Sequence, residues 1–141
     1  MTRLPPRPRV LLADDHTRLR EALRDLLEET GFEVVGESGD GADAVAMARE
    51  LEPDIVVIDL RMPVLNGLDA TRLIRDARPA TQVVVLSAFE SPELERQARE
   101  AGAFAYLDKG TMADRVHRVL LAAAVQALRA AASGPAPGSP S

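Results

Sequence analysis

Residues 53–59 read Pro-Asp-Ile-Val-Val-Ile-Asp, and this stretch decides the fold. Its centre, Ile55–Ile58, is β-branched throughout and shows no alternation of apolar with polar residues. Such a run predicts a strand that is buried on both faces, as strands of a parallel sheet are. The strand is expected to end at Asp59, which would bring a carboxylate to the carboxyl edge of the sheet.

Short apolar runs and helical stripes alternate on both sides of this strand. Four further strands are expected, at Val10–Ala13, Phe32–Glu37, Val83–Leu86 and Phe104–Leu107. Between them, apolar residues recur at the three- and four-residue spacing of amphipathic helices. The members of these stripes are Leu19, Ala22, Leu23, Leu26 and Leu27; Ala44, Val45, Ala48 and Leu51; Ala70, Leu73, Ile74 and Ala77; and Leu94, Ala98 and Ala101. A last helix is predicted from about Met112 to Ala132.

Helix-end signals agree with this division of the chain. Asp40 and Asn66 stand where N-caps are expected, and Pro92 suits the first turn of a helix. Five strands that alternate with helix-length crossovers predict an α/β fold, with a parallel sheet covered by helices on both faces. We expect one domain over residues 9–132, with disordered tails at 1–8 and 133–141.

Composition narrows the classes of function. The 141 residues carry a net charge of −5, so the chain lacks the basic excess of a nucleic-acid binder. It has no cysteine, which excludes disulfides and thiolate metal sites. No apolar run approaches the roughly 18 residues that span a bilayer. We therefore expect a cytoplasmic protein without a membrane partner.

Polar side chains follow four of the expected strands. They are Asp14 and Asp15, Asp59, Ser87 and Lys109. In an open α/β sheet, ligands bind at the carboxyl ends of the strands, so these groups are expected to converge. Three carboxylates in one cleft repel each other unless a cation is present, and oxygen ligands suit Mg²⁺.

A phosphoryl site accounts for this set of groups. Asp15 and Asp59 would ligate the metal directly, Asp14 could act through water, and the backbone carbonyl of Arg61 could supply a further oxygen. Lys109 and the Ser87 hydroxyl would hold phosphoryl oxygens, and Asp59 would be the nucleophile.

Four segments that contain these residues resemble response-regulator receiver domains of bacterial two-component systems. They are Val10–His16, Asp54–Pro63, Val83–Ser87 and Gly102–Lys109. The resemblance covers about Arg9 to Ala132. Within the family, the motifs are most similar to those of receivers in regulators with a LuxR-type helix-turn-helix. It implies a flavodoxin-like fold with strand order 2-1-3-4-5.

The resemblance also implies roles. Asp59 would accept a phosphoryl group from a histidine kinase or phosphotransfer protein, and Asp14, Asp15 and Asp59 would bind Mg²⁺, or Mn²⁺ in its place. Ser87, Lys109 and Tyr106 would contact the phosphate or switch with it. The face formed by the fourth helix, the fifth strand and the last helix would then control an output partner or homodimerisation. Such a protein is a signalling phosphoacceptor that assists its own phosphotransfer and dephosphorylation.

Each of these residues also has a plainer interpretation. Asp14-Asp15 could simply start a helix, and Lys109 could be a solvated lysine. We interpret His16 as a surface residue at a helix start rather than a ligand, and His117 as solvated. Tyr106 could be partly buried with its hydroxyl in water. Arg61 and Phe89 are expected to tune the lifetime of the phosphate.

Other functions remain open at this point. A metal-dependent phosphohydrolase would also use an aspartate nucleophile, but it usually needs a second acid close after the nucleophile, and Arg61 stands two residues after Asp59. Control of transcription would belong to a longer parent that carries a DNA-binding domain. The sequence leaves open whether this chain is a stand-alone receiver or a receiver without its output domain.

Overall fold

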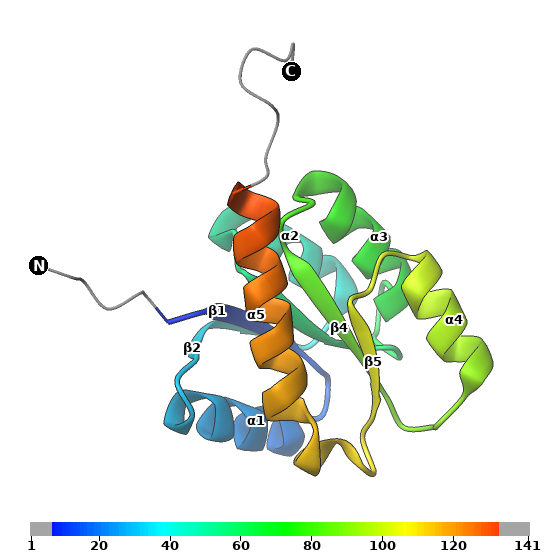
Figure 1. Ribbon diagram of the computed structural model, residues 1–141. Helices are drawn as coiled ribbons and strands as arrows, with labels where there is room; N and C mark the ends of the chain where they lie inside the picture. Colours follow the sequence, from blue (N-terminus) through cyan, green and yellow to red (C-terminus); the bar gives the residue numbers. More distant parts are fainter. Residues whose placement is uncertain (1–6, 133–141) are drawn as a thin grey trace, which may run out of the picture.

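The structure is a computed structural model that describes residues 7–132 as a parallel sheet between two layers of helices (Figure 1). The strand order is β2-β1-β3-β4-β5, and each neighbouring pair is parallel. The strands are β1 (Arg9–Ala13), β2 (Glu33–Ser38), β3 (Ile55–Asp59), β4 (Gln82–Ser87) and β5 (Ala105–Asp108). The predicted α/β class and the 2-1-3-4-5 order are therefore confirmed.

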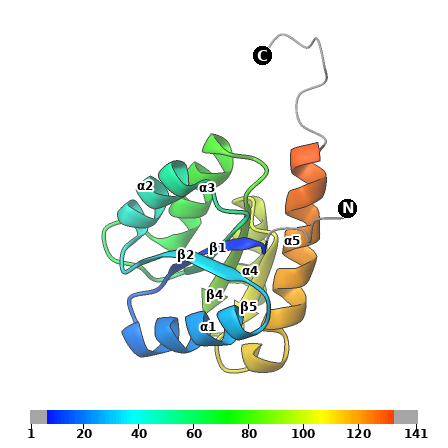
Figure 2. The ribbon, with the colours of Figure 1, turned by 90° about the vertical axis from the view of Figure 1, so that its left-hand side faces the viewer.

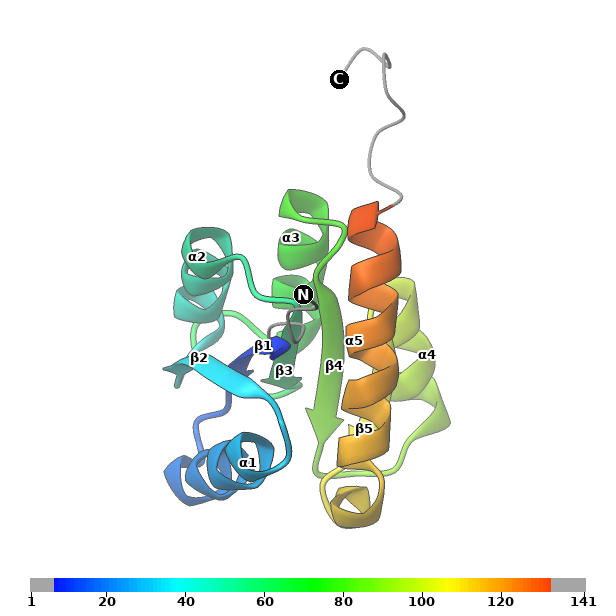
Figure 3. The same cartoon turned by 60° about the vertical axis from the view of Figure 1, so that its left-hand side comes forward.

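Helices cover both faces of the sheet. They are α1 (Thr17–Glu29), α2 (Gly41–Leu51), α3 (Gly67–Ala77), α4 (Pro92–Glu100) and α5 (Val116–Ala132). Helices α1 and α5 lie on one face, and α2, α3 and α4 lie on the other (Figures 2 and 3). Within β3, Ile55 and Val57 point to the α1/α5 side, while Val56 and Ile58 point to the opposite side. Since both sides of the strand are buried, its apolar run is continuous.

The helix starts follow the predicted signals. Asp40 caps α2 and Asn66 caps α3, each accepting a hydrogen bond from the backbone N–H three residues on, at 2.7 and 2.9 Å. Pro92 occupies the first turn of α4, as expected. The cap of that helix, Ser91, was not predicted; its hydroxyl accepts the same type of bond at 3.2 Å.

Two predictions near the last helix are wrong. Residues Met112–Asp114 form a separate 3₁₀ turn, η1, closed by a 2.8 Å bond from the Arg115 N–H to the Met112 carbonyl, and α5 begins only at Val116. This i→i+3 bonding is tighter than an α-helical turn, and it seats the Met112 side chain in the α1/α5 core. His117 is partly buried rather than solvated, because its ring packs edge-on against Phe32 with centroids 5.8 Å apart.

The predicted tails lie mostly outside the described residues. This is true of residues 1–6 and of 133–141. Pro8, which falls inside the expected N-terminal tail, accepts a 2.9 Å hydrogen bond from the Glu33 N–H through its carbonyl. Within residues 7–132, no helix combines the length and the apolar character needed to cross a membrane.

Candidate functional site

The carboxyl edge of the sheet brings together the predicted site residues. Asp59 is the last residue of β3 and Ser87 the last of β4, while Asp14 and Lys109 directly follow β1 and β5. Backbone bonds extend the sheet to these positions: the Lys109 N–H donates to the Ser87 carbonyl at 2.7 Å, and the Asp14 N–H donates to that of Ser38 at 3.0 Å. The site residues are therefore positioned by the rigid sheet itself.

Lys109 lies between two buried carboxylates. Its Nζ is 3.0 Å from Oδ2 of Asp59 and 2.9 Å from Oδ2 of Asp14. Burial alone would lower the pKa of Lys109, but hydrogen bonds to both acids and their negative charges outweigh it and raise that pKa. The lysine therefore stays an ammonium. The structure thus places Lys109 beside Asp59 with a side chain that is only 15% exposed, not as a solvated surface lysine; its contact with phosphate stays a prediction.

Asp59 is only 4% exposed, and its surroundings act on its charge in opposite directions. Burial raises the pKa of Asp59, the hydrogen bond from Lys109 lowers it, and the nearby charge of Asp14 raises it again; the net shift is upward. The Arg61 N–H also donates to Oδ1 of Asp59 at 3.2 Å. The carboxylate is thus held in place from two sides while its charge is not fully compensated.

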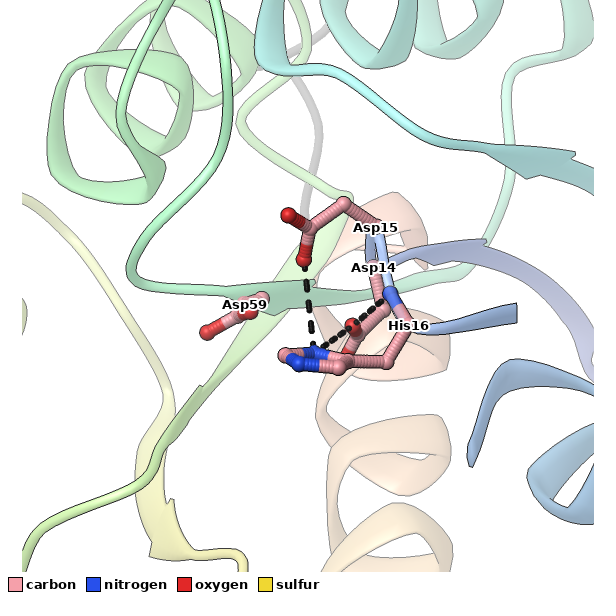
Figure 4. Close-up of side chains that lie close together, drawn as sticks. All are labelled: Asp14, Asp15, His16 and Asp59. Atoms are coloured by element: carbon pink, nitrogen blue, oxygen red, sulfur yellow. Dashed lines mark hydrogen bonds and ion pairs between the residues drawn. The ribbon is translucent and has the colours of Figure 1, made fainter. Parts of the chain in front are cut away.

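A candidate cation site adjoins the ion pair between Lys109 and Asp59. Asp14, Asp15, His16 and Asp59 each offer a ligand atom, and these four atoms lie within 4.8 Å of one another (Figure 4). Oδ2 of Asp14 is buried, and among the described residues it is contacted by Nζ of Lys109 at 2.9 Å. Three carboxylates whose oxygens converge in this way are a donor set that suits a hard divalent cation, so the residues present fit such an ion.

The side chain of His16 is exposed, as expected, but its ring also contacts two acids of the site. It stands at the N-cap of α1 with a 70% exposed side chain, as predicted for a residue at a helix start. Its ring nevertheless turns toward the acids, with Nδ1 3.2 Å from Oδ1 of Asp14 and 3.4 Å from Oδ1 of Asp15. The prediction that it is only a surface residue is therefore incomplete.

The loop after β4 is tied to the site by two hydroxyls. The Phe89 N–H donates to Oγ of Ser87 at 3.1 Å, and the Tyr106 hydroxyl donates to the Phe89 carbonyl at 2.6 Å. Tyr106 is 7% exposed, so the alternative of a hydroxyl in water is wrong. Sequence reasoning selected Ser87 and Tyr106 but missed the loop backbone that joins them, because a backbone carbonyl leaves no signal in the sequence.

Arg61 and Phe89 meet across the rim of the site. The guanidinium carbon of Arg61 lies 5.4 Å from the centroid of the Phe89 ring, which is a cation–π distance. Phe89 is 55% exposed, although it is a large apolar residue. Arg61 stands two residues after Asp59, the last residue of β3, and both Arg61 and Phe89 were predicted to influence the lifetime of the phosphate. The ligand role predicted for the Arg61 carbonyl stays a prediction.

Comparisons with known proteins agree with this geometry. Residues 10–121 match the family model described as response regulator receiver domain. The transcriptional regulatory protein PdtaR of Mycobacterium tuberculosis is 46% identical over 101 residues, which are 72% of this chain and 49% of that protein. The chain thus spans about half the length of that relative.

In two further matches, the aligned region covers most of the matched protein. The chemotaxis protein CheY of Thermotoga maritima is 38% identical over 112 residues, which are 79% of this chain and 93% of that protein. Among solved structures, the receiver domain of the putative response regulator NarL from Mycobacterium tuberculosis has a TM-score of 0.81 and 31% identity, covering 86% of this chain and 98% of that one. The described domain is therefore similar to receivers over nearly its whole length.

Proposed function

Because this chain belongs to the family of response regulator receiver domains, which are phosphoacceptors of two-component signalling, we propose that Asp59 is its phosphoacceptor. The observation that carries the proposal is the position of Asp59 at the end of β3, buried and 3.0 Å from the ammonium of Lys109. A carboxylate held in this way can attack phosphorus while a fixed cation stands beside it.

The proposed transfer uses groups already in position. An oxygen of Asp59 forms a bond to phosphorus as the bond from phosphorus to the donor breaks, and a histidine donor keeps the electron pair and takes up a proton. The product is an acyl phosphate. Lys109 balances the negative charge of the phosphoryl oxygens, and the Ser87 hydroxyl donates to one of them after releasing the Phe89 N–H.

A divalent ion completes the proposed site. Receiver domains generally bind Mg²⁺, and we propose that Asp14, Asp15 and Asp59 hold Mg²⁺ or Mn²⁺ here, with the backbone carbonyl of Arg61. The ion supplies positive charge that offsets the phosphoryl group and the three acids. The convergence of three carboxylates, with Lys109 as the ammonium beside two of them, supports this assignment.

The proposed switch runs from Ser87 through Phe89 to Tyr106. If Ser87 turns toward the phosphate, the Phe89 N–H loses its acceptor, and the loop that also holds the Tyr106 hydroxyl must rearrange. That loop leads into α4, in which only Ala98 is fully buried. An element with so few buried residues can move at small cost, so the α4-β5-α5 face is the proposed output surface.

The first test is phosphorylation with acetyl phosphate and Mg²⁺, followed by intact-mass measurement. We expect a phosphoryl adduct on the wild type that disappears in Asp59→Ala and persists in Asp76→Ala, because Asp76 is exposed on α3 away from the site. Lack of an adduct on the wild type, where a known receiver is labelled, would mean that the domain signals by binding alone. Adducts that survive Asp59→Ala would overturn the assignment.

Further parts of the proposal concern partners. We propose a sensor histidine kinase or phosphotransfer protein as donor, which implies a cytoplasmic location, and control of transcription as the role of a longer protein, as in PdtaR. This domain is not proposed to contact nucleic acid itself.

A homodimer through the α4-β5-α5 face is also proposed. It is supported by Leu121, Val125 and Leu128, which are exposed on α5 at helical spacing. A rise in light-scattering mass with a phosphoryl analogue should be lost in Leu128→Glu and kept in Leu73→Glu, which alters an exposed leucine of α3. A mass that stays monomeric in the wild type would refute the dimer.

A further inference from the structure

The geometry around His16 points to an additional metal ligand. We propose that Nδ1 of His16 ligates the divalent ion together with the carboxylates, and that the site therefore prefers a transition ion such as Mn²⁺ to Mg²⁺. This inference rests on the proposed phosphoryl site, because it concerns the same ion, but it assigns a residue and a metal preference that the phosphoacceptor function does not require.

The distances fit a shared ion. Two neighbouring ligands on an octahedral ion with bonds of about 2.1 Å are about 3 Å apart. Nδ1 of His16 lies 3.2 Å from Oδ1 of Asp14 and 3.4 Å from Oδ1 of Asp15. Figure 4 shows the imidazole beside both carboxylates, with Asp59 directed to the same region from β3. All four ligand atoms lie within 4.8 Å of one another, close to the spacing of about 4.2 Å between opposite ligands on such an ion.

The backbone holds His16 in this position. Its N–H donates to Oδ1 of Asp14 at 2.8 Å, and its carbonyl accepts from the Arg20 N–H at 3.0 Å in the first turn of α1. The side chain makes no capping hydrogen bond, so the ring is not needed to start the helix. A ring that is fixed at its base and open to solvent can take up an ion without rearrangement of the fold.

A simple ion pair between a protonated His16 and the two acids is the competing explanation. Such a pair at an exposed histidine contributes little to stability. It also leaves the charge of three neighbouring acids to be offset by Lys109, which contacts only Asp14 and Asp59 among them. A shared ion accounts for the orientation of the ring and also supplies positive charge among the three carboxylates.

The proposed preference for Mn²⁺ over Mg²⁺ follows from the nitrogen ligand. Mg²⁺ binds oxygen and dehydrates reluctantly, whereas imidazole suits first-row transition ions such as zinc, iron and nickel; Mn²⁺ is the weakest binder of that series and therefore the most stringent member with which to test the preference. Removal of the ring should therefore weaken binding of Mn²⁺ much more than binding of Mg²⁺. We expect a loss of about tenfold or more for Mn²⁺, since even the loss of an outer-shell partner costs that much, and little change for Mg²⁺.

Pulsed electron paramagnetic resonance of Mn²⁺ bound to the full chain tests the ligand directly. The chain has two histidines, so His117→Gln is a matched control for His16→Ala. We expect ¹⁴N coupling from imidazole in the wild type and in His117→Gln, and none in His16→Ala. Labelling of the wild type with ¹⁵N-histidine should change the coupling, which identifies the ligand as a histidine without any mutation.

Titration calorimetry with Mn²⁺ and Mg²⁺ on the same proteins measures the preference. If Mn²⁺ binds the wild type without nitrogen coupling, the role of His16 as a ligand is refuted. If His16→Ala weakens both ions equally, the preference for Mn²⁺ is refuted. The phosphoacceptor proposal stands in either case. If neither ion binds the wild type, the proposed metal site fails as well. Labelling of Asp59 by acetyl phosphate, measured in parallel, separates these outcomes.

Discussion

Nζ of Lys109 lies 3.0 Å from Oδ2 of Asp59, yet the pKa of Asp59 is still raised, because burial outweighs the stabilising effect of this ammonium. Between the ordinary carboxyl pKa and the raised value, the folded protein keeps a proton that the unfolded chain has released. The free energy of unfolding therefore falls as pH rises through that window. At neutral pH, the charged Asp59 destabilises the metal-free fold.

Asp59→Asn should remove the destabilising effect of the buried Asp59 charge. In the presence of a chelator at pH 7, we expect the variant to be more stable than the wild type by about 1 kcal/mol, a common gain when an unfavourable charge is removed. The difference should shrink as pH falls toward the ordinary carboxyl pKa of 3.8. Urea unfolding across this range gives the measurement, with Asp76→Asn on exposed α3 as control. A variant less stable than wild type at pH 7 would contradict the argument.

Tyr106→Phe should loosen the loop after β4. The change removes the 2.6 Å bond from the Tyr106 hydroxyl to the Phe89 carbonyl and keeps the buried ring. We expect a loss of about 1 kcal/mol in the free energy of unfolding, the usual net value of one hydrogen bond. Amide exchange should accelerate mainly in residues 88–91. Unchanged exchange in that segment would show that the hydroxyl does not hold the loop.

The parts that the sequence predicted well are those that depend on strand position. Asp14, Asp59 and Lys109 stand at strand ends, and the parallel sheet alone brings them to one edge. The ring of His16 is different, because its direction depends on side-chain rotation and on neighbouring acids. The start of α5 was missed for a related reason: the burial of Met112 favours a 3₁₀ turn over a continuous helix, and this depends on the packing around it.

The contact between Arg61 and Phe89 should slow dephosphorylation. The guanidinium and the ring belong to the loops that follow β3 and β4, and an exposed cation–π contact contributes about 0.5–1 kcal/mol. If that contact must open to admit water, Arg61→Ala should speed loss of phosphate by roughly two- to fivefold. Phe89→Ala should give a similar rate, and the double variant should add little to either.

The decay of the phosphorylated protein, followed by intact mass, tests this prediction. Arg72→Ala is the control, since Arg72 is an exposed arginine of α3 that pairs with Asp69. Equal half-lives for the wild type and both single variants would refute the shielding role. Fully additive effects would instead show that the two side chains act independently.

Gly67 is the position where the site depends most closely on backbone contact. A Cβ atom added there would lie 2.9 Å from the Cα of Leu60 and closer still to the carbonyl oxygen of Asp59. Both atoms belong to backbone, so Gly67→Ala must shift either the start of α3 or the end of β3. We expect a destabilisation of about 2–3 kcal/mol, as for an overpacked core, and slower phosphorylation because Asp59 moves. Gly39→Ala is the matched control, since its added Cβ would meet nothing closer than 3.9 Å. Denaturant unfolding and acetyl phosphate labelling of both variants measure the two effects, and a Gly67→Ala protein as stable and as readily labelled as Gly39→Ala would refute the steric argument.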